Sequence, residues 1–583
     1  MYRFKINELM LNSIQGEIPL KPKKVNVFIG PNNSGKSRFL KELRDYLSGD
    51  MRELSIIKEM KFDYPEDFEK LDESYHLSGK MVKDLNGNWV LRAFSNKTNN
   101  AWNVHASFDS LYTKSLHSFG GDWKNHFKNI IGNREESGFF EYLGPLFFQY
   151  LGTEERLTIC KEQLNHGLDS NNTNYLSSFK FETMLLKELC QNVKRIFHKN
   201  IILDTQTLGD RIVFRVGDDF EYINGLFGNE QGDISRLFNE KKLDDQGDDL
   251  KSYVSTFLSL NLKGSDVLLI DEPEAFLHPP LARQVGELIG DFNDEKQIFV
   301  STHSVEVLKG ILSKSSDVNV IRITQPETYK NQINILDKGI LKNIIQTPLL
   351  RVSRILEGLF CKKVVITEAE ADELIYQELI EKIFPQSGLY FAHGQNKQTL
   401  ADIAELYQEI GIEYEIIVDF DVLRDSSEFY KFLKIMPLKE KERQRYKAYA
   451  EKMREIVNDS VEKEGLSEEE LNEIQKKKRD EVYHKQGLSF FDVDLQGKIS
   501  NTLEVLSCNH LHILESGELE TLLISYEIPH KNKKEWITEA INKLGELRRE
   551  DIVSNNKLYK FLESIKGYAI LVREEFSCLE FIM

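Results

Sequence analysis

Several features that would place this chain in a common class are missing from its sequence. None of its five cysteines forms a CxxC pair, which argues against a zinc knuckle or a disulfide framework. No apolar run approaches the length that spans a bilayer, and the amino-terminal MYRFKINELMLN lacks a secretory hydrophobic region followed by a cleavage site. We therefore expect a cytoplasmic protein without membrane contacts, in which the cysteines are reduced.

An excess of basic residues is also missing. The net charge is −18, which disfavours a surface coated with nucleic acid, although basic segments such as residues 187–199 occur locally and are more often solvated helix faces. Of the 583 residues, 40% are hydrophobic, with 35 Phe and 22 Tyr. That is enough for packed cores in roughly three to four domain-sized units.

A phosphate-binding loop is predicted near the amino terminus. KKVNVFIGPNNSGKSRFLKEL runs from a β-branched stretch through a glycine-rich turn into helix-forming residues, and GPNNSGKS fits the GxxxxGK[ST] pattern. Glycines at 30 and 35 let backbone N–H groups curl round a phosphate, Lys36 reaches the β- and γ-phosphate oxygens, and the Ser37 hydroxyl ligates Mg²⁺. The alternative is a chance glycine-rich turn.

Two later strands carry the groups that such a loop requires. DVLLIDEPEAFLHPP, residues 266–280, is an apolar strand ending in Asp271, which can hold the Mg²⁺ shell, and Glu272, which can polarise the attacking water. QIFVSTHS ends in His303, where a γ-phosphate contact is expected, although a lone histidine at a strand end is usually structural. The residues predicted to bind the nucleotide are Gly30, Asn33, Gly35, Lys36, Ser37, Arg38 and Asp271.

These motifs, in this order, resemble the head of an ABC-type ATPase of the SMC-like branch. The resemblance implies that Glu272 is the catalytic base and that His303 senses the γ-phosphate. QGDDLKSYVSTFLSL stands in the place of the signature motif, which contacts the partner subunit's nucleotide in a head-to-head dimer, but it lacks LSGG and matches loosely at Gly247 and Ser252. FFQYLGTEER, around Gln149 and Arg156, is the best candidate for the Q-loop.

Between these motifs lies a long segment without a sustained heptad pattern, so no coiled coil is expected. It contains strand-like pieces, NWVLRAFS and RIVFRV, and a helical one, SSFKFETMLLKELCQNVKRIF. We interpret about 60–225 as a compact α-rich insertion used for dimerisation, within an ATPase domain over residues 1–345.

A second set of acidic residues follows two further apolar strands. In KKVVITEAEADELIY the apolar run ends at Glu368, and Asp372 falls in the first turn of the helix that begins after Ala369. In EYEIIVDFDVLRD a strand delivers Asp419 and Asp421, which alternation along an extended backbone puts on the same side. Converging carboxylates suit a hard divalent cation, whereas the alternative is solvated acids at sheet edges.

A strand ending in Glu followed by a strand ending in DxD resembles a TOPRIM domain, here over residues 362–583. An ABC-type head followed by TOPRIM resembles the OLD (overcoming lysogenization defect) family of nucleases. That resemblance implies two metals about 4 Å apart and a late lysine that stabilises phosphate charge, for which Lys557, or failing that Lys560, is available. The residues implied as metal ligands are Ser37, Asp271, Glu368, Asp372, Asp419, Asp421, Glu518 and Glu520, the last two from GELE.

The chain departs from the family pattern in two places. Ala369 replaces the usual glycine, which would strain a turn that needs positive φ. A charged, helix-forming insertion over about 430–490 separates DxD from GELE, and we interpret it as a helical hairpin with a turn near Gly465, most simply a solvated arm. Glu370 and Glu373 are interpreted as ordinary carboxylates at a helix start.

The sequence therefore predicts an α/β protein: an ABC-type ATPase domain, a linker helix over 346–361 and a Rossmann-like TOPRIM domain. The resemblance implies an ATP-regulated DNA endonuclease using Mg²⁺ or Mn²⁺, forming a homodimer or higher homo-oligomer through its heads. It also implies a role in anti-phage defence, as in Gabija-like or retron-associated systems, with a helicase or a retron reverse transcriptase as partner. The alternative is a DNA-repair-type ATPase with a non-cleaving TOPRIM scaffold; a primase or topoisomerase lacks its zinc module or tyrosine-bearing domain.

Overall fold

The computed structural model of the chain divides into two compact units, Met1–Lys338 and Gly339–Met583, and each is described by itself. The residues described are 3–64, 67–75, 81–83, 89–94, 111–113, 123–133, 139–140, 143–144, 147–165, 175–180, 182–220, 231–261, 265–292, 296–327, 330–336, 354–394, 397–462, 467–526, 528 and 533–566.

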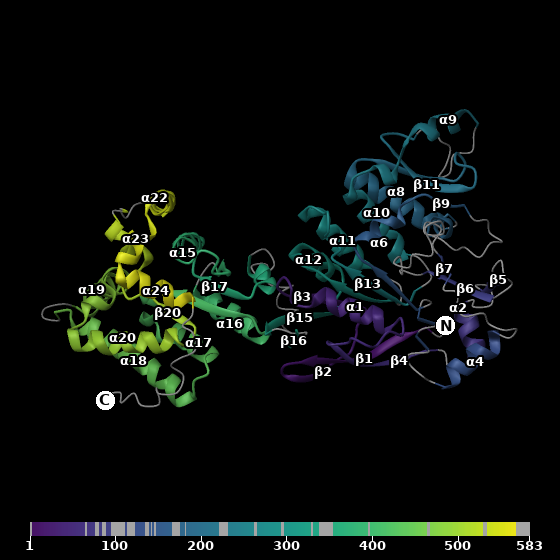
Figure 1. The fold of residues 1–583 in the computed structure, drawn as a ribbon. Coiled ribbons are helices and arrows are strands. Elements are labelled where there is room, and N and C mark those ends of the chain that lie inside the picture. Colours follow the sequence, from purple (N-terminus) through teal and green to yellow (C-terminus); the bar gives the residue numbers. More distant parts are fainter. Residues whose placement is uncertain are drawn as a thin grey trace. The chain divides into compact units, whose positions relative to one another are not determined.

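A six-stranded sheet organises the first unit (Figure 1). In spatial order its strands are β16 (Lys330–Ile335), β15 (Val318–Glu327), β3 (Val25–Ile29), β14 (Gln297–Ser301), β13 (Val267–Asp271) and β8 (Phe148–Leu151). All neighbours pair in parallel except β15 with β16. The predicted motif strands β3, β13 and β14 are buried along their whole length, and because parallel strands end at one edge, their carboxyl-terminal loops meet there.

Helix α1 (Lys36–Tyr46) lies between this sheet and a second, antiparallel sheet. That sheet has the order β2 (Gly16–Leu20), β1 (Lys5–Ser13), β4 (Ile57–Asp63). A single apolar core joins the three layers, including Leu9 of β1, Phe39 of α1 and Phe299 of β14. Phe28 and Phe39 stack at 4.0 Å between ring centroids, which fixes the helix that starts at the glycine-rich loop.

The rest of the first unit combines helices with short strands. Its helices are α2 (Phe68–Tyr75), α4 (Trp123–Asn133), α6 (Thr153–Ile159), α7 (Tyr175–Phe179), α8 (Thr183–Phe197), α9 (Gln231–Asn239), α10 (Asp248–Asn261), α11 (Pro279–Asp291) and α12 (Val305–Lys314). Its small sheets contain β5 (Met81–Lys83), β6 (Trp89–Phe94), β7 (Leu111–Thr113), β9 (Gln163–Leu164), β10 (Asn200–Asp204), β11 (Arg211–Gly217) and β12 (Lys241–Lys242). The predicted insertion thus contains strands as well as helices over its described residues.

The second unit is built on a four-stranded parallel sheet. Its order is β18 (Leu389–His393), β17 (Lys363–Thr367), β19 (Glu413–Val418), β20 (Leu511–Ile513). An apolar core on one face includes residues of α15 (Glu370–Ile383) and of the late helices α21 (Leu519–Leu523), α22 (Lys533–Glu546), α23 (Arg549–Ser554) and α24 (Asn556–Lys566). Helices α16 (Lys397–Glu409) and α20 (Val493–Ser507) also pack on the strands. The predicted α/β architecture of both domains is confirmed.

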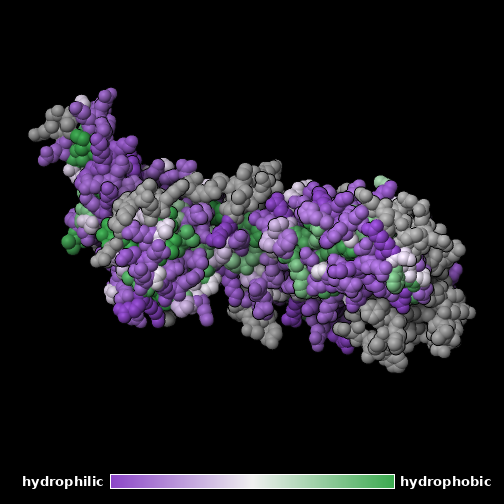
Figure 2. Space-filling model, turned by 90° about the horizontal axis from the view of Figure 1, so that it is seen from above, coloured by the Kyte–Doolittle hydropathy of each residue, from purple (hydrophilic) through white to green (hydrophobic). Residues whose placement is uncertain are grey.

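The charged segment between DxD and GELE is helical, as predicted. After α17 (Ser426–Ile435) it forms α18 (Glu440–Asp459) and α19 (Glu468–Glu481), which pack together, while the predicted turn at Gly465 lies outside the described residues. The described part of the predicted linker helix is a 3₁₀ helix over Arg354–Phe360. The face seen in Figure 2 is mostly hydrophilic over the described residues, and no helix described has the length and apolar content to cross a bilayer.

Candidate functional site

The glycine-rich loop closes round the side chain of Lys36. Its ammonium donates hydrogen bonds to the carbonyl oxygens of Gly30 and Pro31, both at 2.7 Å. Burial lowers the pKa of Lys36 to about 8, against the opposing effect of nearby carboxylates. Gly30, with φ 141°, passes so close to β15 that a Cβ would lie 2.1 Å from the Ile323 carbonyl oxygen, so only glycine fits there. Gly35, with φ 98°, begins α1.

The acids at the end of β13 are held rigidly. Asp271 accepts hydrogen bonds from Ser301 and from the Tyr150 hydroxyl, the latter at 3.1 Å. Glu272 has a positive φ of 49°, a conformation that costs free energy and is common where a side chain must be aimed. Arg156, 1% exposed, donates to the carbonyl oxygens of Asp271 at 2.6 Å and Glu272 at 2.7 Å. Arg156 therefore positions both acids through their main chain.

His303 lies beside the predicted catalytic base. Its Nε2 is 3.6 Å from Oε1 of Glu272, and burial, with the nearby Lys36 charge, lowers the pKa of His303. Its backbone N–H donates to Glu274 at 2.5 Å, and the same carboxylate accepts from Thr302 at 2.8 Å. The histidine loop is thus hydrogen-bonded to the segment that follows Glu272.

Other residues predicted for the nucleotide site have different surroundings. Arg38 is exposed and bonds to Glu42 four residues later at 3.1 Å. Asn33 is exposed on the loop, and Ser37 is half-buried in the first turn of α1. Gln149 is buried in β8 with its amide bonded to Tyr175, so it has a packing role.

The loose match to the signature motif at Ser252 is not supported by the surroundings of this residue. Ser252 is 1% exposed inside α10, where nine of its neighbours in the helix are buried as well. A hydroxyl packed inside its own unit is not presented to the nucleotide of another subunit. Gly247, which precedes α10, is the part of the motif that stays at the helix start.

Three carboxylates converge at the carboxyl-terminal edge of the second sheet. Glu368 follows β17, Asp419 and Asp421 follow the neighbouring β19, and one oxygen of each lies within 4.8 Å of the other two. Oε1 of Glu368 accepts a hydrogen bond from the Asp419 backbone N–H at 3.1 Å. Two adjacent parallel strands therefore present three acids to one point, as the alternation of side chains predicted.

The charges of this cluster favour a bound cation. Burial, together with the neighbouring carboxylates of Asp421 and Asp372, raises the pKa of Glu368 to about 7, and burial and the Glu368 charge raise the pKa of Asp419. Ionising both Glu368 and Asp419 without a counter-charge is therefore unfavourable. Oxygen donors at this spacing fit Mg²⁺ or Mn²⁺, which prefer such ligands.

A lysine that the sequence reading missed lies among these acids. The Lys397 ammonium bonds to Asp421 and is 3.5 Å from Oε2 of Glu368. Burial acts to lower its pKa, but the carboxylates outweigh burial and raise it. Lys397 begins α16, the helix that follows β18, so it is delivered by a third strand that ends at the same edge of the sheet. The ammonium occupies the kind of position that a cation would take, which supports the fit of a metal here.

The GELE segment lies beside the cluster together with a residue of the helical insertion. Glu518 donates its backbone N–H to the His484 carbonyl oxygen at 3.0 Å, and Oε1 of Glu518 is 2.7 Å from Nδ1 of His484. The close Glu518 carboxylate, with Asp421 beyond it, raises the pKa of His484 against the effect of burial. Glu520 is half-buried in the first turn of α21 and is not among the converging oxygens.

Two family models match the chain. One, described as "AAA domain, putative AbiEii toxin, Type IV TA system", covers residues 250–309, and the other, "Overcoming lysogenization defect protein-like, TOPRIM domain", covers residues 359–421. The first range contains Asp271, Glu272 and His303, and the second contains the whole converging cluster. The chain thus carries an AAA-type ATPase domain and an OLD-like TOPRIM domain, and both support an OLD-type ATPase-TOPRIM protein.

The similarity to individual known proteins is limited in extent. The Old nuclease of Escherichia phage P2 is 25% identical over 173 residues, which is 28% of this chain and 28% of that protein. Among solved structures, an SmcHead bound to the C-winged helix domain of ScpA covers 57% of this chain and 98% of its own, at 11% identity and TM-score 0.30. The C-terminal region of the Xanthomonas campestris pv. campestris OLD protein covers 35% and 92%, at 10% identity and TM-score 0.17.

The alanine in the OLD-family TOPRIM turn is not strained. Ala369 has φ −135°, an extended conformation that any residue adopts, so the expected penalty for the missing glycine is absent. Its N–H donates to Asp372 at 3.0 Å. Asp372 therefore caps the start of α15 and acts on the cluster through its charge, while its oxygens are not part of the converging set.

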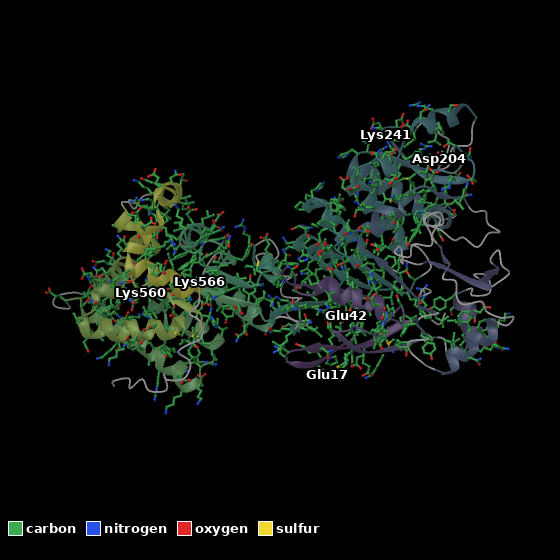
Figure 3. All side chains as sticks on the ribbon, in the orientation of Figure 1. Glu17, Glu42, Asp204, Lys241, Lys560 and Lys566 are labelled. Atoms are coloured by element: carbon green, nitrogen blue, oxygen red, sulfur yellow. The ribbon has the colours of Figure 1, made fainter. Side chains whose placement is uncertain are left out.

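The lysine implied by the family resemblance lies elsewhere. Lys557 is exposed on α24, and Lys560, labelled in Figure 3 on the same helix, is exposed too. Among the described residues, no hydrogen bond or ion pair joins either ammonium to the converging carboxylates. Lys397 is the lysine that the fold delivers to this site.

The interpretation of Glu373 as an ordinary helix-start carboxylate is wrong. Glu373 is 1% exposed and pairs with Arg354 at 2.5 Å and with Nδ1 of His393 at 2.6 Å. His393 ends β18 directly opposite Thr367 of β17. This buried group ties the 3₁₀ helix that contains Arg354 and the end of β18 to α15.

A second buried network supports the sheet from the other end of β19. Glu415, 4% exposed, pairs with His512 at 2.8 Å and Lys363 at 2.9 Å, and His512 contacts Ser564 of α24. Although burial opposes it, the contacts of Glu415 with His510 and His512 and the Lys363 charge hold the pKa of Glu415 well below its usual range. The network ties three strands to the last described helix.

Replacing Glu415 with glutamine is expected to destabilise the second unit by about 3 kcal/mol, because it removes the charged partner of the half-buried Lys363 ammonium and a hydrogen-bond acceptor of the buried His512. A carboxylate whose pKa falls on folding stabilises the protein above its unfolded pKa of about 4.3, and that contribution is lost as the pH falls toward the folded value. Urea unfolding, together with hydrogen exchange of the backbone amides in β19 and β20, measures the change in the free energy of unfolding. Glu413→Gln, exposed on the same strand, is the control; equal unfolding midpoints would contradict the role.

Proposed function

We propose that the chain is an ATP-regulated, divalent-metal-dependent DNA endonuclease of the OLD type. The observation that carries the proposal is the convergence of Glu368, Asp419 and Asp421 with Lys397 at one edge of the parallel sheet. Carboxylates that hold a cation, next to a positive charge, are the groups that phosphodiester hydrolysis requires. The phage P2 relative is named a nuclease, and its likeness to this chain supports the same assignment.

The residues of the second unit divide the chemistry between them. Glu368, Asp419 and Asp421 would hold Mg²⁺ or Mn²⁺, which when bound supplies an acidic water and a Lewis acid for the phosphate. The Lys397 ammonium, held between two of these acids, is placed to stabilise the negative charge that grows on the phosphate oxygens. Water attacks phosphorus, the phosphorus–oxygen bond to one sugar breaks, and the leaving oxygen takes up a proton.

The first unit supplies the ATP-dependent control. The backbone of the glycine-rich loop and Lys36 would bind the phosphates, and Ser37 and Asp271 would hold the Mg²⁺ that accompanies them. Glu272, aimed by its positive φ and by Arg156, would act as general base on the attacking water. We propose that ATP joins two heads and that hydrolysis resets or releases the nuclease.

The cellular role we propose is anti-phage defence, with a helicase or a retron reverse transcriptase as partner and a homodimer or higher homo-oligomer as the assembly. Phage plaque counts on cells expressing the wild-type gene with its neighbouring genes, beside the same cassette carrying Glu368→Gln, test it; equal plaque counts would contradict the role.

The central experiment incubates the purified full chain with plasmid DNA and Mg²⁺ or Mn²⁺, with and without ATP. We expect nicked or linear DNA that depends on the metal and disappears with EDTA, and a rate that changes when ATP is added. Absence of metal-dependent cleavage in every condition, including with a candidate partner, would favour the non-cleaving scaffold. The backbone at Ala369 is extended, with φ −135°, so the departure from the usual glycine gives that alternative no support.

A separate prediction concerns ATP hydrolysis. Glu272→Gln is expected to lower the hydrolysis rate by about 10²–10⁴-fold while ATP binding is retained, because only the general base is removed. Phosphate release and binding of a fluorescent ATP analogue measure the two properties. Glu306→Gln, which breaks a half-buried pair with Lys309 on α12, is the matched control. Wild-type hydrolysis by Glu272→Gln would show that another group is the base.

A further inference from the structure

The helical insertion ends in a turn that packs against both acidic loops. After α19 the chain forms one π-helical turn over Val482–Gln486, a rare element that occurs often at functional sites. Tyr483, fully buried, packs on Phe420 at 5.9 Å between ring centroids, and Arg424 of the DxD loop pairs with Asp480 at 2.6 Å. The base of the insertion is therefore part of the acidic site, whereas the sequence favoured a solvated arm.

The main chain of this turn also touches the GELE loop. A Cβ added to Gly517, which has φ 101°, would lie 2.3 Å from the His484 carbonyl oxygen, and one added to Gly487 would lie 2.1 Å from the Glu515 carbonyl oxygen. Two glycines thus allow the two segments to approach each other closely. The Leu488 N–H donates to Glu515 at 2.7 Å, which fixes the register of the contact.

The side chain of His484 faces two acids that come from different loops. Its Nδ1 is 2.7 Å from Oε1 of Glu518 and 3.8 Å from Oδ2 of Asp421. Nδ1 is buried, yet it has no aligned hydrogen-bond partner, so the short contact with Glu518 is off the axis of the ring nitrogen. An additional group between these atoms would satisfy the nitrogen and separate the two carboxylates.

We propose that His484 is a ligand of a divalent cation bound between Asp421 and Glu518, so that the insertion completes the metal centre. This inference rests on the proposed function, which it deepens by adding a nitrogen ligand. Two atoms that each lie about 2.1 Å from one ion are about 3 Å apart at a right angle and never more than about 4.2 Å apart. The 3.8 Å separation from Asp421 lies between these two values, and the 2.7 Å separation from Glu518 is slightly shorter than the right-angle value, so Glu518 would move outward slightly on binding the ion.

An imidazole ligand has a consequence for the identity of the metal. Nitrogen is a softer donor than carboxylate oxygen and suits transition ions better than Mg²⁺. The site is therefore expected to prefer Mn²⁺ to Mg²⁺, and His484→Asp, which restores an oxygen donor, is expected to reduce that preference. His484→Ala is expected to weaken binding of one Mn²⁺ by at least about tenfold.

The direct test is pulsed electron paramagnetic resonance of Mn²⁺ bound to the wild-type full chain, without ATP or DNA. A ¹⁴N modulation on the Mn²⁺ echo is expected, and it should disappear in His484→Ala while persisting in Lys485→Ala, an exposed neighbour in the same turn. Calorimetric titration is expected to give about two Mn²⁺ ions per wild-type chain and one fewer tight ion in His484→Ala. Wild-type protein without ¹⁴N coupling, or His484→Ala with unchanged Mn²⁺ affinity, overturns the proposal.

Plasmid cleavage assayed in parallel separates this inference from the proposed function. Nitrogen coupling without DNA cleavage in any condition would leave the metal ligand standing and refute the nuclease. Metal-dependent cleavage without nitrogen coupling would support the nuclease and refute the His484 ligand. Because the Mn²⁺ signal is recorded on the wild type, this test does not depend on whether a variant folds.

Discussion

Replacing Asp419 with asparagine is expected to lower metal-dependent DNA cleavage by about 10³-fold or more, the loss that follows when a metal-held nucleophile or electrostatic stabilisation is removed. Asp419 lies between Glu368, whose carboxylate its own N–H contacts at 3.1 Å, and Asp421 two residues on. An amide keeps the shape of this side chain but removes the negative charge. ATP hydrolysis should be unchanged, because Asp419 belongs to the other unit.

The same substitution is expected to leave the protein at least as stable. Folding raises the pKa of Asp419 by burial and by the neighbouring Glu368 charge, so the ionised group opposes folding at neutral pH. A neutral amide removes that repulsion, and the melting temperature in EDTA should not fall. Asp402→Asn, an exposed acid on α16, controls for charge. Cleavage by Asp419→Asn at the wild-type rate would remove the site assignment even if the activity is real.

The residues that the sequence predicted well are those fixed by local pattern. A glycine-rich loop between a strand and a helix, and acids at the ends of apolar strands, depend on neighbouring residues and on the alternation of an extended chain. Gly30, Asp271 and Asp419 are therefore placed as expected. The parallel order of the strands then brings the ends of β17 and β19 together.

The residues that were missed depend on contacts between distant segments. Glu373 lies on the same helical face as Tyr376 and Ile380, so helical periodicity could have indicated its burial. Its partners Arg354 and His393, by contrast, come from two other elements, and no local pattern predicts them.

Lys397 and His484 are reached by different routes. The strand before Lys397 ends at the same sheet edge as Glu368, so the rule that such edges bind ligands could have pointed to it. His484 follows a long charged segment and meets GELE only through close main-chain packing, which composition does not reveal.

Two expectations failed for the same physical reason, one for Ser252 in α10 and one for the turn at Ala369. Ser252 matched a motif by residue type, but the apolar neighbours of α10 bury it, and packing overrides the match. Ala369 was judged by the residue usual in the family, whereas its own backbone is extended. In both cases the conformation of this chain, and not the identity of the residue, decides what the position can do.

The second large effect is expected at Lys397. Lys397→Met should lower the cleavage rate at saturating metal by about 10²–10³-fold, because it removes a positive charge from beside the phosphate. It should also tighten Mn²⁺ binding by at least about tenfold, or about 1.4 kcal/mol, because in the wild type the Lys397 ammonium competes with the metal for Asp421 and Glu368. Cleavage rates against metal concentration, together with calorimetric Mn²⁺ affinity, measure both changes.

Opposite signs for rate and affinity are what distinguish a catalytic lysine from a structural one. If Lys397 were only structural, replacing it would lower both the cleavage rate and the Mn²⁺ affinity, because the carboxylates it holds would separate. Lys431→Met, exposed on α17, controls for loss of a surface charge. Lys557→Met provides the direct comparison with the family position: if it abolishes cleavage while Lys397→Met does not, α24 supplies the positive charge despite its exposure here. If only Lys397→Met does, the charge comes from the edge of the sheet, and the same side chain that holds the acids together before the metal binds stabilises the phosphate after it.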